Sequence, residues 1–307
     1  MTNKDHDYFN YKIPQSEYRN AKEKTNEDRI KIDTSITKLN IKNEADKEAL
    51  KEKINQEKFY LKKILLKIKK SFITLITKYS ICLTYRISDN YILISEKFIA
   101  DFLKFTKIKD PSKIKIIENP HTVELEKFDY AHLKKNEIIY VGRLAENKKL
   151  LRVLEIWDKL EKFDLDWQLK IVGDGPERAK LESYIKEKNL KNVSLLGFQD
   201  SLIPHYQSAK LFILTSDYEA WGLVLVEAMS YGVVPLVLNS YASASDIVKC
   251  NVNGILHNVP FNANEFANSI LELVNNPEKM DEFSNSARAV YQEYAPKKIG
   301  EKWLELF

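Results

Sequence analysis

Short apolar runs alternate with helical stretches over residues 137–275, and this alternation restricts the fold more than any other feature of the chain. The runs are short and apolar enough for buried strands, and they occupy 138–141, 169–172, 193–197, 211–214 and 233–238. Strands that alternate with helices pack as a parallel sheet covered on both faces. We therefore predict a doubly wound α/β domain.

The run 211–214 leads into residues 215–227, Thr-Ser-Asp-Tyr-Glu-Ala-Trp-Gly-Leu-Val-Leu-Val-Glu, where a loop opens a helix. At the carboxyl end of a strand, the backbone N–H groups of residues 222–224 can hold an anion such as a diphosphate. Two carboxylates, Glu219 in the loop and Glu227 on the helix, would repel that anion unless they accept hydrogen bonds from the neutral hydroxyls of a sugar and a ribose. The stretch indicates a nucleotide-sugar site, although a loop acid and a solvated helix acid are the commoner explanation of such a pair.

Two further loops follow predicted strands. The first contains Arg143 and Lys148, and a guanidinium and an ammonium at this spacing suit a diphosphate, although surface Arg and Lys residues are common in this Lys-rich chain. The second is Gly173-Asp174-Gly175-Pro176, in which two glycines allow the backbone to approach a ligand closely and proline suits the first turn of a helix. Arg178 stands where a dinucleotide-binding fingerprint needs a third glycine, so this loop does not match that motif.

Residues 215–227 resemble the Glu-x7-Glu signature of retaining glycosyltransferases of family 4, which have the two-Rossmann-domain GT-B architecture. Other motifs of that family follow the same order over residues 81–307. They are Gly142-Arg143-Leu144 with Lys148, Gly173-Asp174-Gly175-Pro176, Phe198-Gln199-Asp200, the loop 240–247 and Asn253-Gly254. One residue departs from the pattern: Ala220 stands where the family has Gly, and Ala would be strained there if the backbone needs a positive φ.

The resemblance implies roles for these residues. Glu219 contacts the donor sugar, Glu227 the ribose, and Arg143 and Lys148 the pyrophosphate of a nucleoside-diphosphate sugar. The remaining donor-binding residues would be Gly173, Gly175, Phe198, Trp221, Gly222, Leu223 and Val224, with Phe198 near the base. The resemblance favours a UDP-sugar over a GDP-sugar only because uridine is commoner among such donors, and it implies transfer with retention by same-face attack in which the leaving phosphate acts as base. Because neither Asp-x-Asp pair of the chain follows an apolar strand, we expect no required metal. A nucleophilic Glu remains an alternative.

The amino-terminal third does not fit a complete GT-B enzyme. Five segments are expected: a charged helical or disordered arm at 1–57, a remnant of the acceptor-side domain at 58–120, a linker at 121–136, the nucleotide-sugar-binding domain at 137–293 and a bracing helix at 294–307. Residues 1–57 carry no clear apolar strand, and recognisable family material begins near Asp89–Ser95. The sequence predicts a truncated or divergent amino-terminal domain.

Residues 58–80 predict a basic amphipathic helix. Eight apolar side chains share one face at helical spacing, and they are Leu61, Ile64, Leu65, Ile68, Phe72, Leu75, Ile76 and Tyr79. No acid occurs in this range, and the positions that lie mainly elsewhere include Lys62, Lys63, Lys67, Lys69 and Lys70. Such a helix can lie on an anionic membrane surface, or it can pack its apolar stripe on the protein core, which is the commoner arrangement.

Several classes of function are disfavoured. The two Asp-x-Asp pairs, Asp5-His6-Asp7 and Asp164-Leu165-Asp166, do not follow apolar strands, and no His/Cys cluster has zinc spacing. Two unpatterned cysteines fit a reducing compartment without a disulfide scaffold, and the net charge of +4 is mild. No nucleic-acid motif, signal peptide or membrane span is visible. We expect a cytoplasmic protein, peripheral at the inner membrane face if residues 58–80 dock there.

The sequence favours a glycosyltransferase that moves a sugar to a glycan or lipid-linked acceptor in bacterial surface polysaccharide or lipopolysaccharide synthesis. Two alternatives stay open. The chain could be the donor-binding half of a split enzyme that needs a separate acceptor-domain protein, or a non-catalytic remnant that acts as an interaction module.

Overall fold

A computed structural model describes residues 48, 52–53, 55, 73–125 and 131–307. The chain divides into two compact units, Met1–Thr77 and Lys78–Phe307. The predicted arm at 1–57 and most of the predicted basic helix lie outside the described residues. Within the described part of that helix, residues 73–80 are helical, and Ile73, Ile76 and Tyr79 are exposed.

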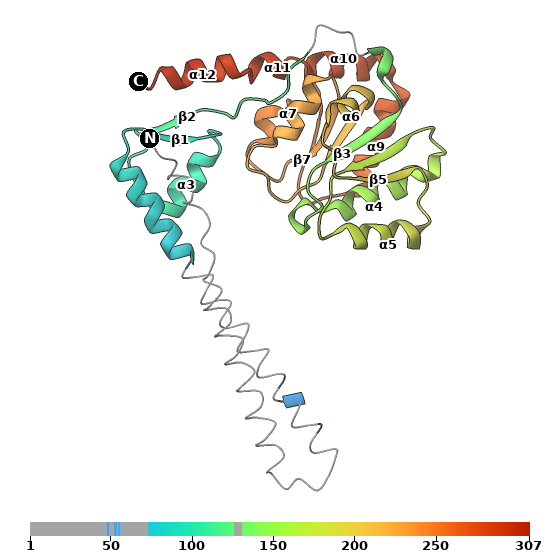
Figure 1. Cartoon of the computed structure of the whole chain (residues 1–307), viewed down its shortest axis with the longest axis horizontal. Coiled ribbons are helices and arrows are strands. Elements are labelled where there is room, and N and C mark those ends of the chain that lie inside the picture. Colours follow the sequence, from blue (N-terminus) through green and yellow to red (C-terminus); the bar gives the residue numbers. More distant parts are fainter. Residues whose placement is uncertain (1–47, 49–51, 54, 56–72, 126–130) are drawn as a thin grey trace. The chain divides into compact units, whose positions relative to one another are not determined.

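The core of the second unit is a six-stranded sheet in which every pair of neighbouring strands is parallel (Figure 1). Its strands, in the order β5-β4-β3-β6-β7-β8, are β3 (Glu137–Val141), β4 (Gln168–Val172), β5 (Val193–Gly197), β6 (Leu211–Leu214), β7 (Val234–Leu238) and β8 (Ile255–His257). All residues of β3, β6 and β7 are buried. Buried parallel strands require apolar side chains on both faces, which is why these segments are continuous apolar runs.

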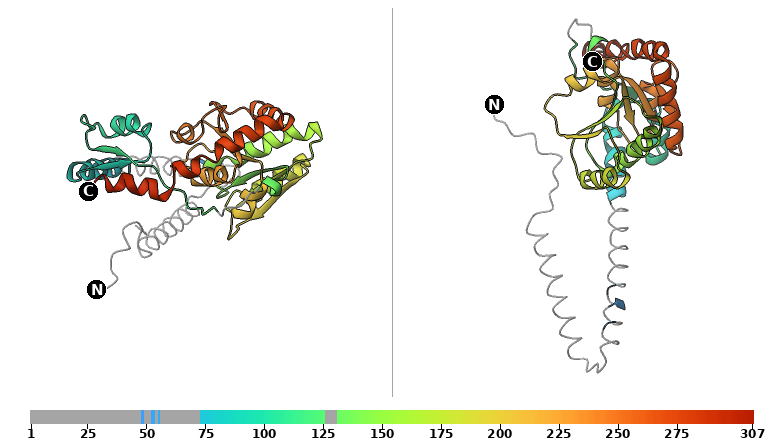
Figure 2. Two further views of the ribbon diagram at one scale, coloured as in Figure 1. Left: turned by 90° about the horizontal axis from the view of Figure 1, so that it is seen from above. Right: turned by 90° about the vertical axis from the view of Figure 1, so that its right-hand side faces the viewer.

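Helices connect the strands and cover both faces of the sheet. They are α4 (Leu150–Leu160), α5 (Arg178–Lys188), α6 (Ile203–Ser208), α7 (Leu223–Ser230), α8 (Ala244–Ile247), α9 (Ala263–Asn275), α10 (Pro277–Ala287), α11 (Val290–Glu293) and α12 (Pro296–Leu304), with 3-10 turns η1 (Ala131–Leu133), η2 (Glu146–Lys148) and η3 (Glu161–Phe163). Figure 1 shows α4 and α5 on one side of the sheet and α6 and α7 on the other. Figure 2 shows the carboxyl-terminal helices, in red, on the outside of this layered domain.

A small parallel sheet precedes the linker. In this sheet β1 (Tyr91–Leu93) pairs with β2 (Ile114–Ile116). The helix α3 (Phe98–Thr106) lies between the two strands in the sequence. The loop after β1 contacts the larger domain through Lys97, whose Nζ lies 3.0 Å from Asp246 Oδ1. After β2, Glu118 pairs with Lys302 of α12 at 2.5 Å.

The predicted α/β class and parallel sheet are confirmed. The strands predicted at 193–197 and 211–214 coincide with β5 and β6, and the other predicted strand boundaries differ by single residues from the observed ones. The proposed division into five segments remains a prediction.

Candidate donor-sugar site

The candidate site lies at the carboxyl-terminal edge of the sheet, where the direction of chain progression reverses. From β3 the chain adds β4 and β5 on one side, and it then returns to add β6, β7 and β8 on the other side of β3. The loops that leave β3 and β6 therefore flank the point where the strand order reverses, and the region between them is called the crevice below. Open α/β sheets bind their ligands in such a crevice.

Backbone and side-chain bonds tie these two loops together. The N–H of Asp217, after β6, donates to the carbonyl of Asn147, after β3, at 2.9 Å. Arg152 of α4 also donates to the Asp217 carboxylate at 2.7 Å and to the carbonyl of Thr215 at 2.9 Å. These contacts fix the loops at the distance that brings Lys148 to Glu219.

Lys148 and Glu219 form an ion pair inside the crevice. Lys148 Nζ lies 2.6 Å from each carboxylate oxygen, and the hydroxyl of Ser216 donates to Glu219 Oε1 at 2.8 Å. The two side chains are only 21% and 11% exposed. Low exposure reduces screening by water and strengthens the attraction between the charges.

Two buried phenols flank Glu219. Burial raises the pKa of Tyr140 and of Tyr241, and the Glu219 carboxylate adds to the rise in both. Tyr140 donates to the carbonyl of Arg143 at 3.3 Å, whereas the hydroxyl of Tyr241 has no hydrogen-bond partner among the described residues. That hydroxyl lies 3.8 Å from the position that a Cβ on Gly222 would take. Because an unpaired buried hydroxyl is costly, an oxygen of a ligand beside Gly222 would be a favourable acceptor.

Arg143 supplies a cation that no described residue neutralises. Its side chain is exposed, and its guanidinium forms no hydrogen bond or ion pair with any described residue. The loop that carries it is held in place by its backbone, since the N–H of Leu144 donates to the carbonyl of Asp174 at 2.9 Å. The backbone that carries Arg143 is thus held in place, while its guanidinium remains available for a ligand.

The start of α7 meets the same crevice. Gly222 has φ 89°, a left-handed conformation that glycine tolerates well, and no side chain caps the first N–H groups of the helix. Leu223 and Val224 are half-buried there. Ala220 is not among the residues with positive φ, so the strain expected from its replacement of glycine does not arise.

The Trp221 side chain is part of the core rather than of the crevice. It is 2% exposed and packs edge-on against Tyr294 at a centroid distance of 5.3 Å, and its indole N–H has no partner in the part of the chain that the structure describes. The donor contact predicted for Trp221 is therefore compatible with its backbone and not with its indole ring.

Glu227 lies deeper, on α7. It is 9% exposed and accepts hydrogen bonds from Thr122 at 2.5 Å and from Tyr206 at 3.0 Å. Burial raises the pKa of the Tyr206 phenol, and Glu227 adds to the rise. Each oxygen of a carboxylate can accept two hydrogen bonds, so each oxygen of Glu227 can still accept one more.

The glycine loop after β4 packs against the Arg143 loop. A Cβ on Gly173 would lie 2.0 Å from the carbonyl oxygen of Gly142, and one on Gly175 would lie 2.5 Å from that of Leu144. Both glycines thus permit the two loops to pack against each other. This explains why glycine is needed at these positions, and the sequence alone did not reveal it. Phe198, after β5, is 75% exposed; a role for these three residues in donor binding remains a prediction.

The structure therefore brings together Arg143, Lys148, Glu219 and the start of α7 at the edge between β3 and β6. Four neighbours were not predicted from the sequence: Ser216, Tyr241, Thr122 and Tyr206. Ser216 and Tyr241 follow strands that end at this edge, which is a signal that could have identified them. The contacts of Thr122 and Tyr206 with Glu227 join residues far apart in the sequence, and no local pattern indicates them.

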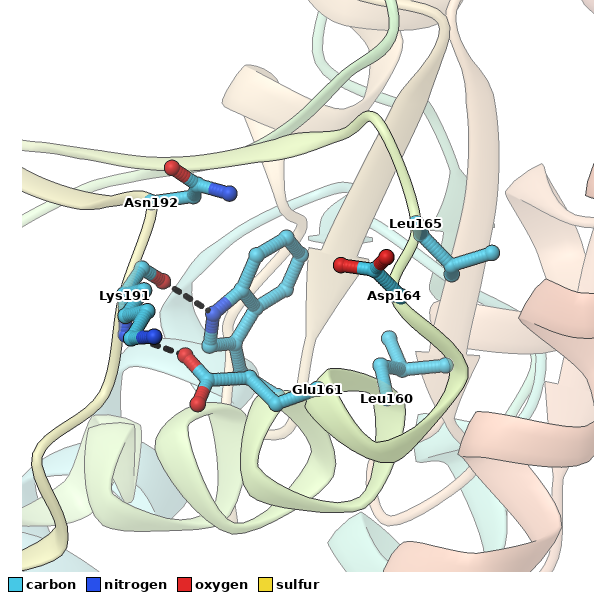
Figure 3. Close-up of a pocket in the computed structure, with 7 residues that line it drawn as sticks. Leu160, Glu161, Asp164, Leu165, Lys191 and Asn192 are labelled. Atoms are coloured by element: carbon cyan, nitrogen blue, oxygen red, sulfur yellow. Dashed lines mark hydrogen bonds between the residues drawn. The ribbon is translucent and has the colours of Figure 1, made fainter.

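The opposite edge of the sheet has a different kind of cavity, of about 150 Å³, next to α4 (Figure 3). Its polar groups bond one another, since the Trp157 indole donates to the Lys191 carbonyl at 2.8 Å and the Lys191 N–H donates to Glu161. Asp164 and Asp166 of the second Asp-x-Asp pair are exposed. Nowhere in the described part of the chain are three or more His, Cys, Asp or Glu residues placed to hold a metal ion.

Comparison with known proteins identifies the family. The profile of glycosyl transferases group 1 matches residues 123–290, which include both loops of the crevice. The chain belongs to the group 1 glycosyl transferases. The membership confirms the predicted resemblance at this level.

Two curated relatives illustrate the similarity. Poly(ribitol-phosphate) alpha-N-acetylglucosaminyltransferase of Staphylococcus aureus (strain COL) is 32% identical over 182 residues, 57% of this chain and 36% of the relative. The second relative is an alpha-1,4-N-acetyl-D-galactosaminyltransferase of Campylobacter jejuni, and its full name includes a PP-undecaprenol-linked glycan. It is 30% identical over 197 residues, which are 63% of this chain and 54% of the relative. The chain therefore spans only about a third to a half of these proteins.

The solved structures agree with the fold. A Staphylococcus aureus TarM variant in complex with Fondaparinux, alpha-GlcNAc-glycerol and UDP superposes with a TM-score of 0.65 at 27% identity, over 73% of this chain and 44% of TarM. The GT-B-like architecture of the described domain is thereby established. Among the described residues, no helix has the length and apolar character needed to cross a bilayer.

Proposed function

We propose that the crevice between β3 and β6 binds a nucleoside-diphosphate sugar and that the chain is a retaining, family-4-type glycosyltransferase. The observation that carries this proposal is the Lys148–Glu219 ion pair, which lies between the loop after β3, where Arg143 also stands, and the loop after β6, which leads into the start of α7. Cations and N–H groups suit a diphosphate, and a carboxylate suits sugar hydroxyls.

Arg143 and Lys148 would hold the diphosphate. Arg143 has no competing partner among the described residues and can offer two parallel N–H groups to phosphate oxygens. The Lys148 ammonium, which pairs with Glu219 in the structure, would also contact the phosphates. Both would then stabilise the negative charge that develops on the leaving diphosphate, with the N–H groups of residues 222–224 assisting.

Glu219 and Glu227 would orient the two hydroxyl-bearing parts of the donor. Glu219 lies in the crevice, where a sugar next to the diphosphate would sit. Glu227 retains one acceptor site on each oxygen, which suits the two hydroxyls of a ribose. Thr122 and Tyr206 would act as positioning residues because they fix the Glu227 carboxylate.

The rest of the donor would lie along the edge toward β4 and β5. The backbone at Gly173 and Gly175 would approach the nucleotide, and the exposed ring of Phe198 would lie near the base. We favour a UDP-sugar over a GDP-sugar, and the presence of UDP with TarM supports the nucleotide class. No metal is required in this scheme, because Arg143, Lys148 and α7 would neutralise the diphosphate.

The acceptor would be a glycan or a lipid-linked glycan of a bacterial surface polymer. The names of the Staphylococcus and Campylobacter relatives support this class. Transfer would retain the anomeric configuration through same-face attack. The reaction would take place at the cytoplasmic side of the membrane, with the basic residues 58–80 contacting the anionic lipid surface.

A second candidate is the donor-binding half of a split glycosyltransferase. In the described range 73–125 that precedes the main domain, the sheet has two strands, β1 and β2. A separate protein would then supply the acceptor side. A non-catalytic interaction module is the outcome if no donor binds.

The proposal is tested by measuring UDP release from UDP-sugars by the purified chain, with and without a lipid-linked glycan acceptor. We expect release that depends on acceptor and that falls in Glu219→Gln, a variant that keeps the side-chain size and removes the charge. Glu301→Gln, on the exposed surface of α12, serves as the matched control. Release that Glu219→Gln leaves unchanged would contradict the assignment of Glu219.

A further inference from the structure

A second polar cavity lies at the amino-terminal edge of the sheet, opposite the edge with the donor crevice. Its volume is about 470 Å³, and it is lined by Lys134, Lys210, Gly232, Met280, Asp281, Ser284, Asn285 and Arg288. Lys134, Lys210 and Gly232 precede β3, β6 and β7, and the other lining residues come from α10 and its end. Because the strands are parallel, these three residues share one edge.

The lining is strongly basic. Two ammonium groups and one guanidinium face a single carboxylate, that of Asp281, which is exposed. None of the three cations forms an ion pair with a carboxylate in the described part of the chain, and the Arg288 guanidinium has no side-chain hydrogen bond there. Three like charges around one cavity repel one another, and either a bound anion or the loss of a proton from one amine relieves that repulsion.

The cations retain hydrogen-bond donors for such an anion. Lys134 Nζ donates to the carbonyls of Tyr206 at 3.0 Å and Ala209 at 2.7 Å, which leaves one of its three N–H groups. Lys210 Nζ donates to Asn136 Oδ1 at 2.8 Å and lies 5.7 Å from the ring centroid of Trp167. The protein bonds thus fix both ammonium groups without using all their donors.

We propose that this cavity binds a small anion that carries a phosphate group. The fork of the Arg288 guanidinium and two fixed ammonium groups suit the several oxygens and the double charge of a phosphate. Met280 is the apolar side chain in the lining, so the cavity offers little for a lipid tail. The ligand is therefore a small soluble phosphate compound, and a volume of about 470 Å³ exceeds that of phosphate alone.

Lys134 should make anion binding detectable through a change in protonation. Burial, together with repulsion from Arg288, lowers the pKa of Lys134 to about 7, and Glu137 partly opposes this shift. Near pH 8 this amine is mostly neutral. An anion beside it favours the charged form and raises the pKa again, so binding is expected to take up a proton.

The test is calorimetric titration of the whole chain with inorganic phosphate at pH 8, in two buffers of different ionisation enthalpy. We expect saturable binding with net proton uptake. Arg288→Gln should weaken it about tenfold, as loss of one charged contact implies, and Lys134→Gln should abolish the proton uptake. Lys186→Gln, an exposed lysine of α5, should bind phosphate as the wild type does, and Arg143→Gln reports any phosphate that binds in the donor crevice instead.

Three results would overturn the proposal: no saturable binding to the wild type, equal binding by Arg288→Gln, or a loss confined to Arg143→Gln, which would locate the phosphate in the donor crevice. The melting temperature of the wild type provides a measurement free of variants. Phosphate should raise it relative to the same ionic strength of chloride, and an unchanged melting temperature at saturating phosphate would also count against the site.

Discussion

Lys148 holds both carboxylate oxygens of Glu219 at 2.6 Å, and the pair joins the loop after β3 to the loop after β6. In this arrangement the cation proposed for the diphosphate is already engaged with the acid proposed for the sugar. Donor binding would place the diphosphate beside Lys148 and the sugar beside Glu219. The Lys148–Glu219 pair would therefore take part both in donor binding and in the sugar-transfer step.

Replacing Lys148 by Met keeps the length of the side chain and removes its charge. We expect kcat for sugar transfer to fall by about 10²–10³, the usual effect of removing one group that stabilises developing charge. The steady-state rate with a UDP-sugar measures this. Lys162→Met, which removes an exposed lysine of η3, should leave kcat unchanged, whereas an unaltered kcat in Lys148→Met would exclude Lys148 from the reaction.

Replacing Tyr206 by Phe tests how Glu227 is positioned. The ring stays packed against Tyr231, at a centroid distance of 6.0 Å, and only the hydrogen bond to Glu227 is lost. We expect uridine and UDP to bind about fivefold more weakly, which corresponds to about 1 kcal/mol. Titration calorimetry measures both affinities.

A merely structural role for Tyr206 would lower the melting temperature without this change in affinity. Pyrophosphate, which lacks a ribose, should bind Tyr206→Phe as it binds the wild type. Tyr184→Phe on α5 is the control for loss of a phenol elsewhere. A parallel loss of pyrophosphate affinity would contradict the positioning role.

Replacing Gly173 by Ala should destabilise the fold. Gly173 has φ +131°, and the added Cβ would lie 2.0 Å from the carbonyl oxygen of Gly142, so the two loops must separate. We expect a loss of about 2–4 kcal/mol in the free energy of unfolding. Denaturant unfolding followed by circular dichroism measures the change.

Gly300→Ala is the matched control, because no atom lies within 4 Å of the added Cβ and the residue is within α12. This substitution should leave stability unchanged or raise it by up to about 1 kcal/mol. Equal effects of the two substitutions would show that the loop contact does not matter.

His257 should make stability depend on pH. Burial lowers its pKa to about 4, against partial opposition from Glu265, and its ring stacks on Phe266 at 3.8 Å. The folded state thus binds the proton less readily than the unfolded state does. Stability from this group is fully present above pH 6.5 and is lost as pH falls toward 4, by up to about 3 kcal/mol.

The melting temperature of the wild type should therefore fall between pH 7 and pH 4.5 more steeply than that of His257→Leu. Each variant is compared with its own value at pH 7, so the baseline effect of the substitution cancels. Equal slopes for the two proteins would show that His257 does not titrate as its buried environment implies.

Much of the main domain could be predicted from sequence, because its strands are buried on both faces. The runs that form β3, β5 and β6 are continuous apolar segments, and glycine-containing loops follow β3 and β4. The convergence of Arg143, Lys148 and Glu219 also follows from topology, since parallel strands end at one edge.

Other features depend on packing and could not be predicted in this way. Trp221 follows the loop that carries Glu219, yet it turns into the core against Tyr294. The Thr122 and Tyr206 contacts with Glu227 require the linker and α6 to meet α7, and no periodicity encodes that meeting. The condition for strain at Ala220 is not met, because the positive φ in this loop belongs to Gly222.

The most direct test of the donor site is calorimetric titration of the purified chain with UDP and with GDP, using Glu227→Ala and the exposed-site control Glu301→Ala. We predict saturable UDP binding, weaker GDP binding, and a loss of at least about tenfold in UDP affinity for Glu227→Ala alone. Absence of nucleotide binding, or equal UDP affinity in Glu227→Ala and the wild type, would contradict a donor site between β3 and β6.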